Sequence, residues 1–507
     1  MPLLLLICLT LACLPIEWRG PLFDLGPNGS AIQTGLVVAS LLLIARWISV
    51  SAVRELARDP GARERVGRTY GFRRFLFFFL NLGGLATVLL VCGWGGTVNH
   101  AMKFGYRVTP APGAEVVILA PYLIALIGSW ALFYDAERAF HAANPLASAR
   151  GPFWSRAGYV GFVLRHHALL VFLPVGLTIA QFGLLRQYPA LLESGWAKAA
   201  TFLLVFLFIL AVPSLVPVIL GLRRMPAGPL RARLERAAKR LKVRYRNLYV
   251  WDTRRNLATA MVAGLVPRFR HIVFTDLLLE TLTEDEIEGV FGHEVGHVKH
   301  GHLLYYAVFL MLSFLTLGAA YHFVEQTITG AWVPTDLALA LSVVTTGAYL
   351  FVVFGIVSRR CERQADVFGC KALSCSDPDC RGHGPETVLV RGGRGLCRTG
   401  VATFVRALER VEEMNGIARS EPKGPRGGLF ARLSGLLRLV GVWLGTWQHS
   451  TIAKRVDFLR TLADDPARER RFQRRVTAFR WGLLILLGLG VLGLAWWGDW
   501  RAMLDSI

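Results

Sequence analysis

The chain has 507 residues, of which 53% are hydrophobic, and it carries a formal net charge of +22. A mean hydropathy of +0.44 is too high for a soluble protein of this length and indicates a membrane protein with several spans. In such a protein, excess Lys and Arg are typical of cytoplasmic loops and of contact with anionic lipids. The lipid bilayer is therefore an expected partner, whereas nucleic acid is not, because the sequence contains no recognisable nucleic-acid module.

Apolar runs make residues 1–225 an N-terminal membrane region with several spans. Residues 2–16 form either a short first span or a cleaved signal peptide, because they are apolar but lack a basic leader. The later apolar runs lie at 31–50, 75–94, 114–134, 168–185, 199–222, 303–325, 337–357 and 481–497. Together they predict a mainly α, polytopic membrane protein with about nine transmembrane helices.

The first polar and basic segment covers residues 226–302. Its leucine pattern at 230–241 predicts an amphipathic helix. Two short strand-like pieces follow, Ala258–Val262 and His271–Phe274, separated by Gly and Pro residues. We therefore expect helices around a small β-sheet in this part of the chain.

A predicted transmembrane hairpin at 303–357 separates this segment from a second basic segment, 358–480. Because a hairpin returns the chain to the side that it left, both segments can belong to one domain. The second segment includes a cysteine-containing insertion at 370–397, and region 481–507 carries the last span.

The charges of the loops predict the orientation of the chain in the membrane. Lys and Arg are retained on the cytoplasmic side, and the loop 54–74 carries seven Arg, whereas the loops of the opposite set carry few. This alternation makes both basic segments cytoplasmic. We therefore expect a multi-pass protein of the cell membrane whose soluble domain faces the cytoplasm.

Residues 291–302 read FGHEVGHVKHGH and contain an H-E-x-x-H motif. His293 and His297 are four residues apart, so on a helix they project from one face and can bind one zinc ion. Glu294 lies between them and can act as the general base for hydrolysis. These residue types at this spacing indicate a zinc-dependent hydrolase.

The residues before the motif also predict a helix. Thr283 and Glu286 form a capping box about two turns upstream of the first His. The alternative interpretation is a solvated helix that is merely rich in His.

Catalytic zinc needs a third protein ligand. The first polar sequence after the hairpin is SRRCERQAD. Because the hairpin returns the chain to the same side, we expect Glu362 at nearly the same depth relative to the membrane as His293 and His297. Asp366 lies one helical turn further and can accept a hydrogen bond from a ligand imidazole. Alternatively, both carboxylates pair with neighbouring arginines, namely Arg359, Arg360 and Arg363.

This part of the chain resembles the membrane-embedded zinc metallopeptidases of the gluzincin type, a family that includes CAAX prenyl protease 1 and the heat-shock protease HtpX. The shared patterns are HEVGHVKHGH, CERQAD for the E-x-x-x-D motif, and RHIVFTDLLL for a strand that leads into a helix. The resemblance covers roughly residues 226–465. It implies a gluzincin-type domain with Glu294 as general base, Asp366 behind the metal, and three zinc ligands: His293, His297 and Glu362.

The resemblance also implies contacts with a substrate. The family's edge strand, N-A-x-x-x-G, is TAMVAG here, so Ala260, Met261 and Val262 would hold an extended peptide by main-chain hydrogen bonds. His449 and Arg455 match a C-terminal element that approaches the substrate carbonyl or carboxylate. A surface ion pair or a solvated helix face is the alternative for these two residues.

The predicted function is that of a metalloendopeptidase with protein or peptide substrates. Its expected substrates are membrane-associated or misfolded proteins, cleaved at the cytoplasmic face. One alternative is a processing protease for lipid-modified C-termini, and another is a membrane sensor or signalling metalloprotease.

Four of the eight cysteines lie close together in the insertion: Cys370, Cys375, Cys380 and Cys397, with His383 between the last two. Stable disulfides are disfavoured in a cytoplasmic segment. Three interpretations remain, namely a second, structural zinc ion, redox-active thiols, and unrelated cysteines.

Overall fold

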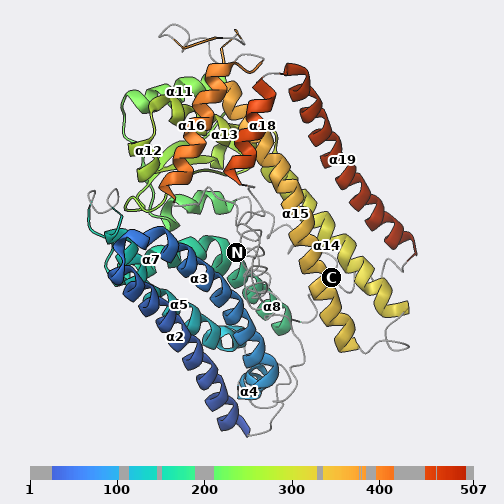
Figure 1. Cartoon of the computed structure of the whole chain (residues 1–507). Helices are drawn as coiled ribbons and strands as arrows, with labels where there is room; N and C mark the ends of the chain where they lie inside the picture. The colour runs from blue at the N-terminus through green and yellow to red at the C-terminus, as the bar shows by residue number, and fades with distance from the viewer. Residues whose placement is uncertain are drawn as a thin grey trace, which may run out of the picture. The chain divides into compact units, whose positions relative to one another are not determined.

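The computed structural model describes residues 26–101, 113–144, 151–188, 211–327, 335–375, 377, 380–383, 395–415, 451–463 and 465–497. Within these residues the chain is mainly helical, and it divides into two compact units (Figure 1). One unit comprises Met1–Leu222 and Arg254–Asn256, and the other comprises Arg223–Thr253 and Leu257–Ile507. The predicted span at 2–16 and the first half of that at 199–222 lie outside the described residues.

The first unit is built from helices. Its longest helices, α2 (Gly26–Arg58), α3 (Arg63–Ala86) and α5 (Ala114–Ala142), pack side by side, as Figure 1 shows in blue and teal. Their interface is filled by small and aromatic side chains such as Ala45 and Phe133, which are buried. The shorter elements are η1 (Pro60–Ala62), α4 (Trp94–Ala101), α7 (Arg156–His167), α8 (Leu173–Gln187) and two π-helical turns, η2 (Thr87–Val91) and η3 (Ala168–Phe172).

The predicted basic loop 54–74 is almost entirely helical in the structure. Helix α2 continues to Arg58, and α3 begins at Arg63 after the short turn of η1. Arg and Glu are good helix formers, and the ion pair between Arg68 and Glu64 (3.2 Å) joins residues one turn apart. The prediction of a loop was therefore wrong, because charged residues can extend a helix beyond its apolar run.

Among the described residues, five helical segments are long and apolar enough to cross a membrane. They are Gly26–Arg58, Arg63–Leu89, Ala114–Ala142, His302–Tyr321 and Ala467–Leu494, and each overlaps a predicted span. The predicted spans at 168–185 and 337–357 are also helical where the structure describes them. A mainly helical chain with several candidate membrane spans is thus confirmed, whereas the total of nine spans and their orientation stay predictions.

The second unit contains a four-stranded sheet in the order β1-β2-β4-β3. Its strands are β1 (Arg223–Arg224), β2 (Asn247–Trp251), β3 (Ala260–Ala263) and β4 (His271–Thr275). Strand β2 runs parallel to β4, and β3 runs antiparallel to β4 with Met261 opposite Val273. Strand β3 is therefore at the edge of this sheet. The sequence predicted β3 and β4 but missed β1, which has only two residues, and β2.

The turn after β3 requires a glycine. Gly264 has a φ of +112°, and a Cβ there would lie 2.5 Å from the carbonyl oxygen of Phe269. The neighbouring Arg270 is buried and donates hydrogen bonds to the carbonyls of Gly264 and Arg244 (3.2 and 2.9 Å). These contacts, with the short helix η4 (Pro267–Phe269), fix the edge strand on the sheet.

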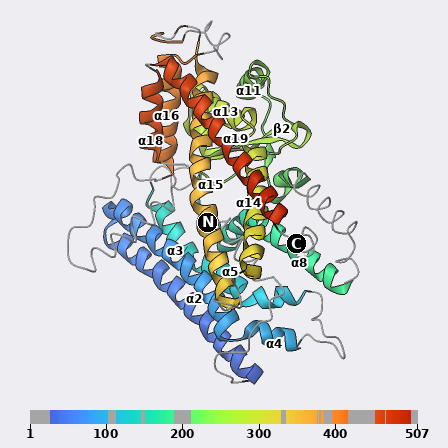
Figure 2. The same cartoon turned by 90° about the vertical axis from the view of Figure 1, so that its right-hand side faces the viewer.

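Helix α13 (Glu284–Lys299), which contains the H-E-x-x-H motif, lies at the centre of the second unit. Its buried residues Ile287 and Phe291 pack with Phe274 of β4 and Leu278 of α12 (Asp276–Thr281) in one core cluster. Helix α13 also contacts α11 (Pro229–Arg240), α14 (His302–Thr327), α15 (Thr335–Leu373) and α16 (Arg398–Met414). Figure 2 shows α14 and α15 alongside α19 (Pro466–Trp497), and α18 (Ile452–Ala463) beside α16.

Helices α13 and α15 approach each other closely because α13 presents glycines to α15. A Cβ at Gly292 would lie 2.5 Å from the Cβ of Ala372, and one at Gly296 would lie 3.0 Å from the Cα of Ala365. The interface has no space for an added methyl group. This packing brings the H-E-x-x-H helix directly against the part of α15 that carries Glu362.

Candidate active site

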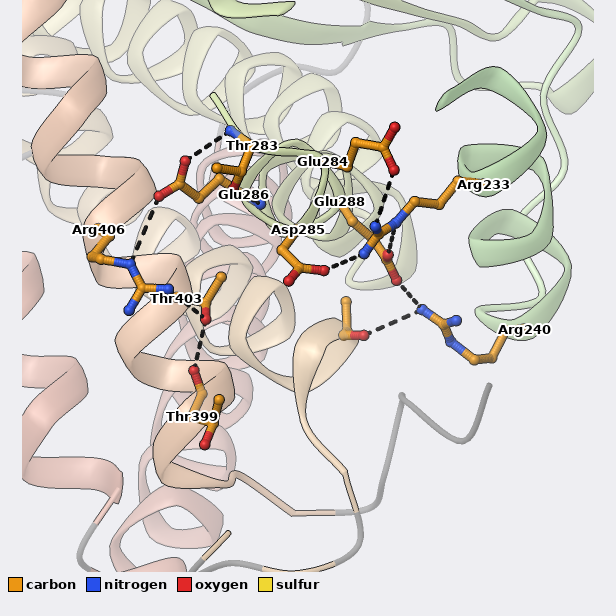
Figure 3. Close-up of polar contacts among 11 residues, drawn as sticks. Arg233, Arg240, Thr283, Glu284, Asp285, Glu286, Glu288, Thr399, Thr403 and Arg406 are labelled. Atoms are coloured by element: carbon orange, nitrogen blue, oxygen red, sulfur yellow. Dashed lines mark hydrogen bonds and ion pairs between the residues drawn. The ribbon is translucent and has the colours of Figure 1, made fainter. Parts of the chain in front are cut away.

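Polar contacts fix the N-terminal half of α13. The Thr283 hydroxyl accepts a hydrogen bond from the backbone N–H of Glu286, whose carboxylate accepts one from the N–H of Thr283 (3.4 and 2.9 Å), so the predicted capping box is present. One half-turn further, the buried carboxylate of Glu288 lies between Arg233 (2.7 Å) and Arg240 (2.5 Å) of α11 (Figure 3). The helix that carries the motif is therefore held in place by contacts distant from the motif itself.

The structure brings together the three predicted zinc ligands. The Nε2 atoms of His293 and His297 are 3.2 Å apart on one face of α13. Glu362 of α15 places its two carboxylate oxygens 3.8 Å from His293 Nε2 and 3.7 Å from His297 Nε2. One donor atom from each residue lies within 4.8 Å of the others.

This donor set fits a catalytic zinc ion. Two imidazoles and one carboxylate are a common set of three protein ligands that leaves a fourth position open. In a tetrahedral site with Zn–N bonds of about 2.0 Å, two nitrogen ligands are separated by about 3.3 Å. The separation of the two Nε2 atoms, 3.2 Å, agrees with this geometry.

Both imidazoles contact polar groups on the side away from the proposed metal. His293 Nδ1 lies 3.0 Å from an oxygen of Asp366, a close contact that is poorly aligned for a hydrogen bond. His297 Nδ1 lies 2.9 Å from Nδ1 of His302, whose Nε2 is 3.2 Å from the side-chain oxygen of Gln364. In both rings Nδ1 faces these groups, so Nε2 is the nitrogen available to a metal.

Arg455 of α18 forms a buried ion pair with Asp366. Its Nε donates to one carboxylate oxygen at 2.8 Å and its Nη2 contacts the other, while Nη1 lies 3.9 Å from Glu362. Burial alone would raise the pKa of Asp366, but Arg455 and His293 outweigh it and hold that pKa below its usual value. Arg455 is 8% exposed, so it does not lie on a solvated helix face. The other predicted C-terminal residue, His449, lies outside the described residues.

The ligands open into a cleft of about 370 Å³. Glu294 lines this cleft beside the ligands and is buried. The edge strand β3 contributes a wall of the cleft through Ala260, Met261 and Val262. The remaining walls are largely apolar and include Leu278, Val290, Leu303, Tyr306, Phe404, Leu408 and Val411. The candidate general base, the candidate metal ligands and a strand edge thus line one cavity.

Sequence reasoning missed two residues that support the site. Gln364 donates a hydrogen bond to Gln473 of α19 at 2.8 Å while its oxygen lies near His302. Arg480 of α19 donates to the backbone carbonyl of His300 at 2.9 Å. The position of Gln364 within the E-x-x-x-D motif was the only available indication, and nothing in the sequence pointed to Arg480.

The structure brings three of the four predicted cysteines of the insertion together and places the fourth, Cys370, elsewhere. Sulfur atoms of Cys375, Cys380 and Cys397 and a ring nitrogen of His383 lie within 4.8 Å of one another. Cys370 does not belong to this group but is fully buried in a core cluster. The inclusion of Cys370 among the metal ligands was therefore wrong, because α15 is still helical at this position and directs the thiol into the core.

Comparisons with known proteins agree with this arrangement. Residues 224–384 match peptidase family M48. A CAAX prenyl protease 1 homolog from Arabidopsis thaliana is 30% identical over 207 residues, which are 36% of this chain and 47% of the relative. A homolog of the same name from Oryza sativa subsp. japonica is 26% identical over 203 residues, 35% and 46% of the two chains. The chain thus spans about half the length of these curated relatives.

The fold is also similar to that of a solved structure. A crystal structure of S. mikatae Ste24p matches 83% of this chain and 99% of its own chain with a TM-score of 0.50, at 13% sequence identity. This likeness concerns the fold, whereas the family match covers the zinc-ligand candidates themselves. Residues 224–384, which resemble peptidase family M48, thus lie in a mainly helical chain that has several candidate membrane spans.

Proposed function

We propose that this chain is a zinc-dependent endopeptidase of the membrane. One observation carries the proposal: His293, His297 and Glu362 converge in a single cleft that Glu294 also lines. A structural zinc site would be closed by a fourth protein ligand, whereas this donor set has three and faces a cavity.

Different residues of the chain would have different roles in the reaction. Zinc, when bound at the three ligands, polarises the scissile carbonyl and lowers the pKa of water. Glu294 accepts a proton from the attacking water and passes it to the leaving amine. Asp366 orients His293, and Arg455 keeps Asp366 ionised. The main chain of β3 holds the substrate in an extended conformation beside the metal.

Among the expected substrates, lipid-modified C-termini have the best support. The similar proteins are named CAAX prenyl proteases, which favours processing of such termini over general breakdown of membrane or misfolded proteins. The apolar walls of the cleft suit an apolar C-terminal segment. No observation in the described residues favours a sensor or signalling role.

We place the enzyme in the cell membrane with its active site on the cytoplasmic side. The apolar helices support the membrane location, and the seven Arg of residues 54–74 support this orientation. A cytoplasmic site would meet the C-terminal tails of proteins anchored to the inner leaflet.

The test uses purified protein and three substrates: a prenylated peptide that ends in a CAAX sequence, the same peptide without lipid, and casein. Glu294→Gln should keep zinc but lose about 10²–10⁴-fold in rate, because only the proton acceptor is removed. Glu362→Ala should lose both zinc and activity. Glu409→Ala, which removes a half-exposed carboxylate on α16, is the matched control and should change neither.

Two results would contradict the proposal in different ways. Wild-type turnover by the Glu294→Gln enzyme would overturn the mechanism. Cleavage of casein and the unmodified peptide as fast as the prenylated peptide would leave a metallopeptidase but remove the proposed substrate class.

A further inference from the structure

We propose that Cys375, Cys380, His383 and Cys397 form a second, structural zinc site, which is separate from the candidate active site. Both Cys380 Sγ and Cys397 Sγ lie close to Nε2 of His383, at 3.5 and 3.4 Å. One donor atom from each of the four residues lies within 4.8 Å of the other three. The donor atoms of the group therefore converge on one point.

The donor set and the distances suit tetrahedral zinc. Three cysteines and one histidine are a common ligand set of structural zinc sites, in which all four positions are taken by protein. With Zn–S bonds of about 2.3 Å and Zn–N bonds of about 2.0 Å, a tetrahedral site separates sulfur and nitrogen ligands by about 3.5 Å. The two measured S···N distances agree with this value.

Two of the four ligands come from ordered helix ends. Cys375 follows the end of α15 by two residues, and Cys397 is the N-cap residue of α16. The backbone N–H of Gly400 donates to Cys397 Sγ at 3.3 Å, and a helix N-terminus favours the thiolate that binds metal. Both sulfur positions are thus set by the packing of α15 against α16.

The other two ligands lie in the segment that joins these helices. Thr399 of α16 fixes Cys380, since its hydroxyl donates to the Cys380 carbonyl at 2.8 Å and its oxygen lies 3.2 Å from Cys380 Sγ. The hydroxyl-to-carbonyl bond does not involve the sulfur, so it can persist when the thiol loses its proton to a metal. The contact brings the middle of the segment back to the beginning of α16.

A zinc ion here would connect two helices that build the active site. Helix α15 carries Glu362, and α16 contributes Phe404 and Leu408 to the cleft. The joining segment is polar and rich in Gly, so it cannot form a core of its own. The metal would therefore hold the end of α15 to the start of α16.

Redox-active thiols and unrelated cysteines fit these observations less well. Three sulfur atoms cannot all pair in disulfides, and no described cysteine forms one. A redox pair also does not require a histidine nitrogen between two sulfur atoms. The arrangement of four ligands around one point is the expected geometry of a metal site.

The experiment counts zinc in full-length protein purified from zinc-supplemented cells. Wild type should contain two zinc ions per chain, and Glu362→Ala should contain one. Adding Cys380→Ser and Cys397→Ser to Glu362→Ala should remove the last ion. Cys370→Ala is the matched control, because Cys370 lies in the same segment but outside the group, and it should leave two ions.

A spectroscopic measurement keeps the test independent of whether the cysteine variants fold. In Glu362→Ala protein loaded with cobalt, the second site should give a thiolate-to-cobalt charge-transfer band. The active site should not give this band, because none of its three candidate ligands is a cysteine. One zinc ion in wild type, none in Glu362→Ala, or a missing charge-transfer band would overturn the second site. Peptidase activity plays no part in these readouts, so the proposed function and the second site can fail separately.

Discussion

Replacing Gly292 by Ala should weaken zinc binding although it changes no ligand. A Cβ at position 292 would lie 2.5 Å from the Cβ of Ala372 and 3.3 Å from the Cα of Gly369. Carbon atoms in contact are about 3.5–4.0 Å apart, so α13 and α15 must separate by about 1 Å at this point. His293 directly follows Gly292, whereas Glu362 lies on α15, so the distances between ligands change by more than the roughly 0.2 Å that a zinc site tolerates.

Two opposing effects set the size of the loss in stability. Overpacking a helix interface costs about 1–3 kcal/mol. Replacing Gly by Ala inside a helix stabilises the fold by about 1 kcal/mol, because Ala has the higher helix propensity. We expect a net loss of about 1 kcal/mol, which corresponds to a Tm lower by about 2–4 °C for a domain of this size. Zinc affinity should fall by about 10–100-fold, as for other changes that disturb ligand orientation.

The assay measures zinc affinity by competition with a chromogenic chelator, together with Tm in detergent. Gly318→Ala is the matched control, since an added Cβ on that helix meets nothing within 4 Å, and it should leave zinc affinity unchanged. Ala372→Gly removes the methyl group on the other side of the interface, so the double variant with Gly292→Ala should regain zinc affinity. The reasoning is refuted when Gly292→Ala behaves like Gly318→Ala.

Three further predictions concern the ion pair, the edge strand and the membrane orientation. In zinc-free protein, the lowered pKa of Asp366 means that its ionised form stabilises the fold. This stabilisation is fully present above the ordinary Asp pKa of about 3.9 and decreases as the pH falls below that value towards the lowered pKa. The Tm deficit of Asp366→Asn should therefore shrink below about pH 4, and a constant deficit would contradict this. Gly264→Ala forces β3 out of position and should raise KM for peptide more than it lowers kcat, whereas unchanged KM would argue against β3 as the substrate strand. For the orientation, each test cysteine is placed in a protein that has no other accessible cysteine. A cysteine introduced by Gly113→Cys should be labelled by an impermeant maleimide added outside intact cells, whereas one introduced by Gly61→Cys should not. The reverse labelling pattern would invert the predicted orientation.

The features that the sequence predicted correctly depend on local spacing. The separation of His293 and His297 by one helical turn, and the capping box at Thr283, follow from residues within a few positions of each other. Glu362 is distant along the chain, but the hairpin argument needed only the side of the membrane to which the chain returns. The His pair and the capping box therefore require no knowledge of how the helices pack.

The features that the sequence could not predict depend on tertiary packing. Arg455 and Asp366 are 89 residues apart, and charge alone does not distinguish this pairing from one with a neighbouring arginine. The replacement of Cys370 by His383 in the cysteine group follows from where α15 ends, and helix ends are poorly defined by sequence. Contacts that depend on how the helices end and pack therefore could be identified only in the structure.

His302 is both the first residue of α14, a candidate membrane span, and the group that backs the ligand His297 at a distance of 2.9 Å. With the bilayer boundary at the start of this candidate span, the proposed metal would lie about one helical turn from the lipid, a height of roughly 5 Å along a helix axis. A scissile bond can reach the metal only when it comes that near to the bilayer. Substrates anchored by lipid would be confined to this thin layer, which raises their effective concentration near the metal. Under the proposed function, weak main-chain binding by β3 would then be sufficient for turnover, and dissolved proteins would be cleaved slowly because they rarely enter the layer.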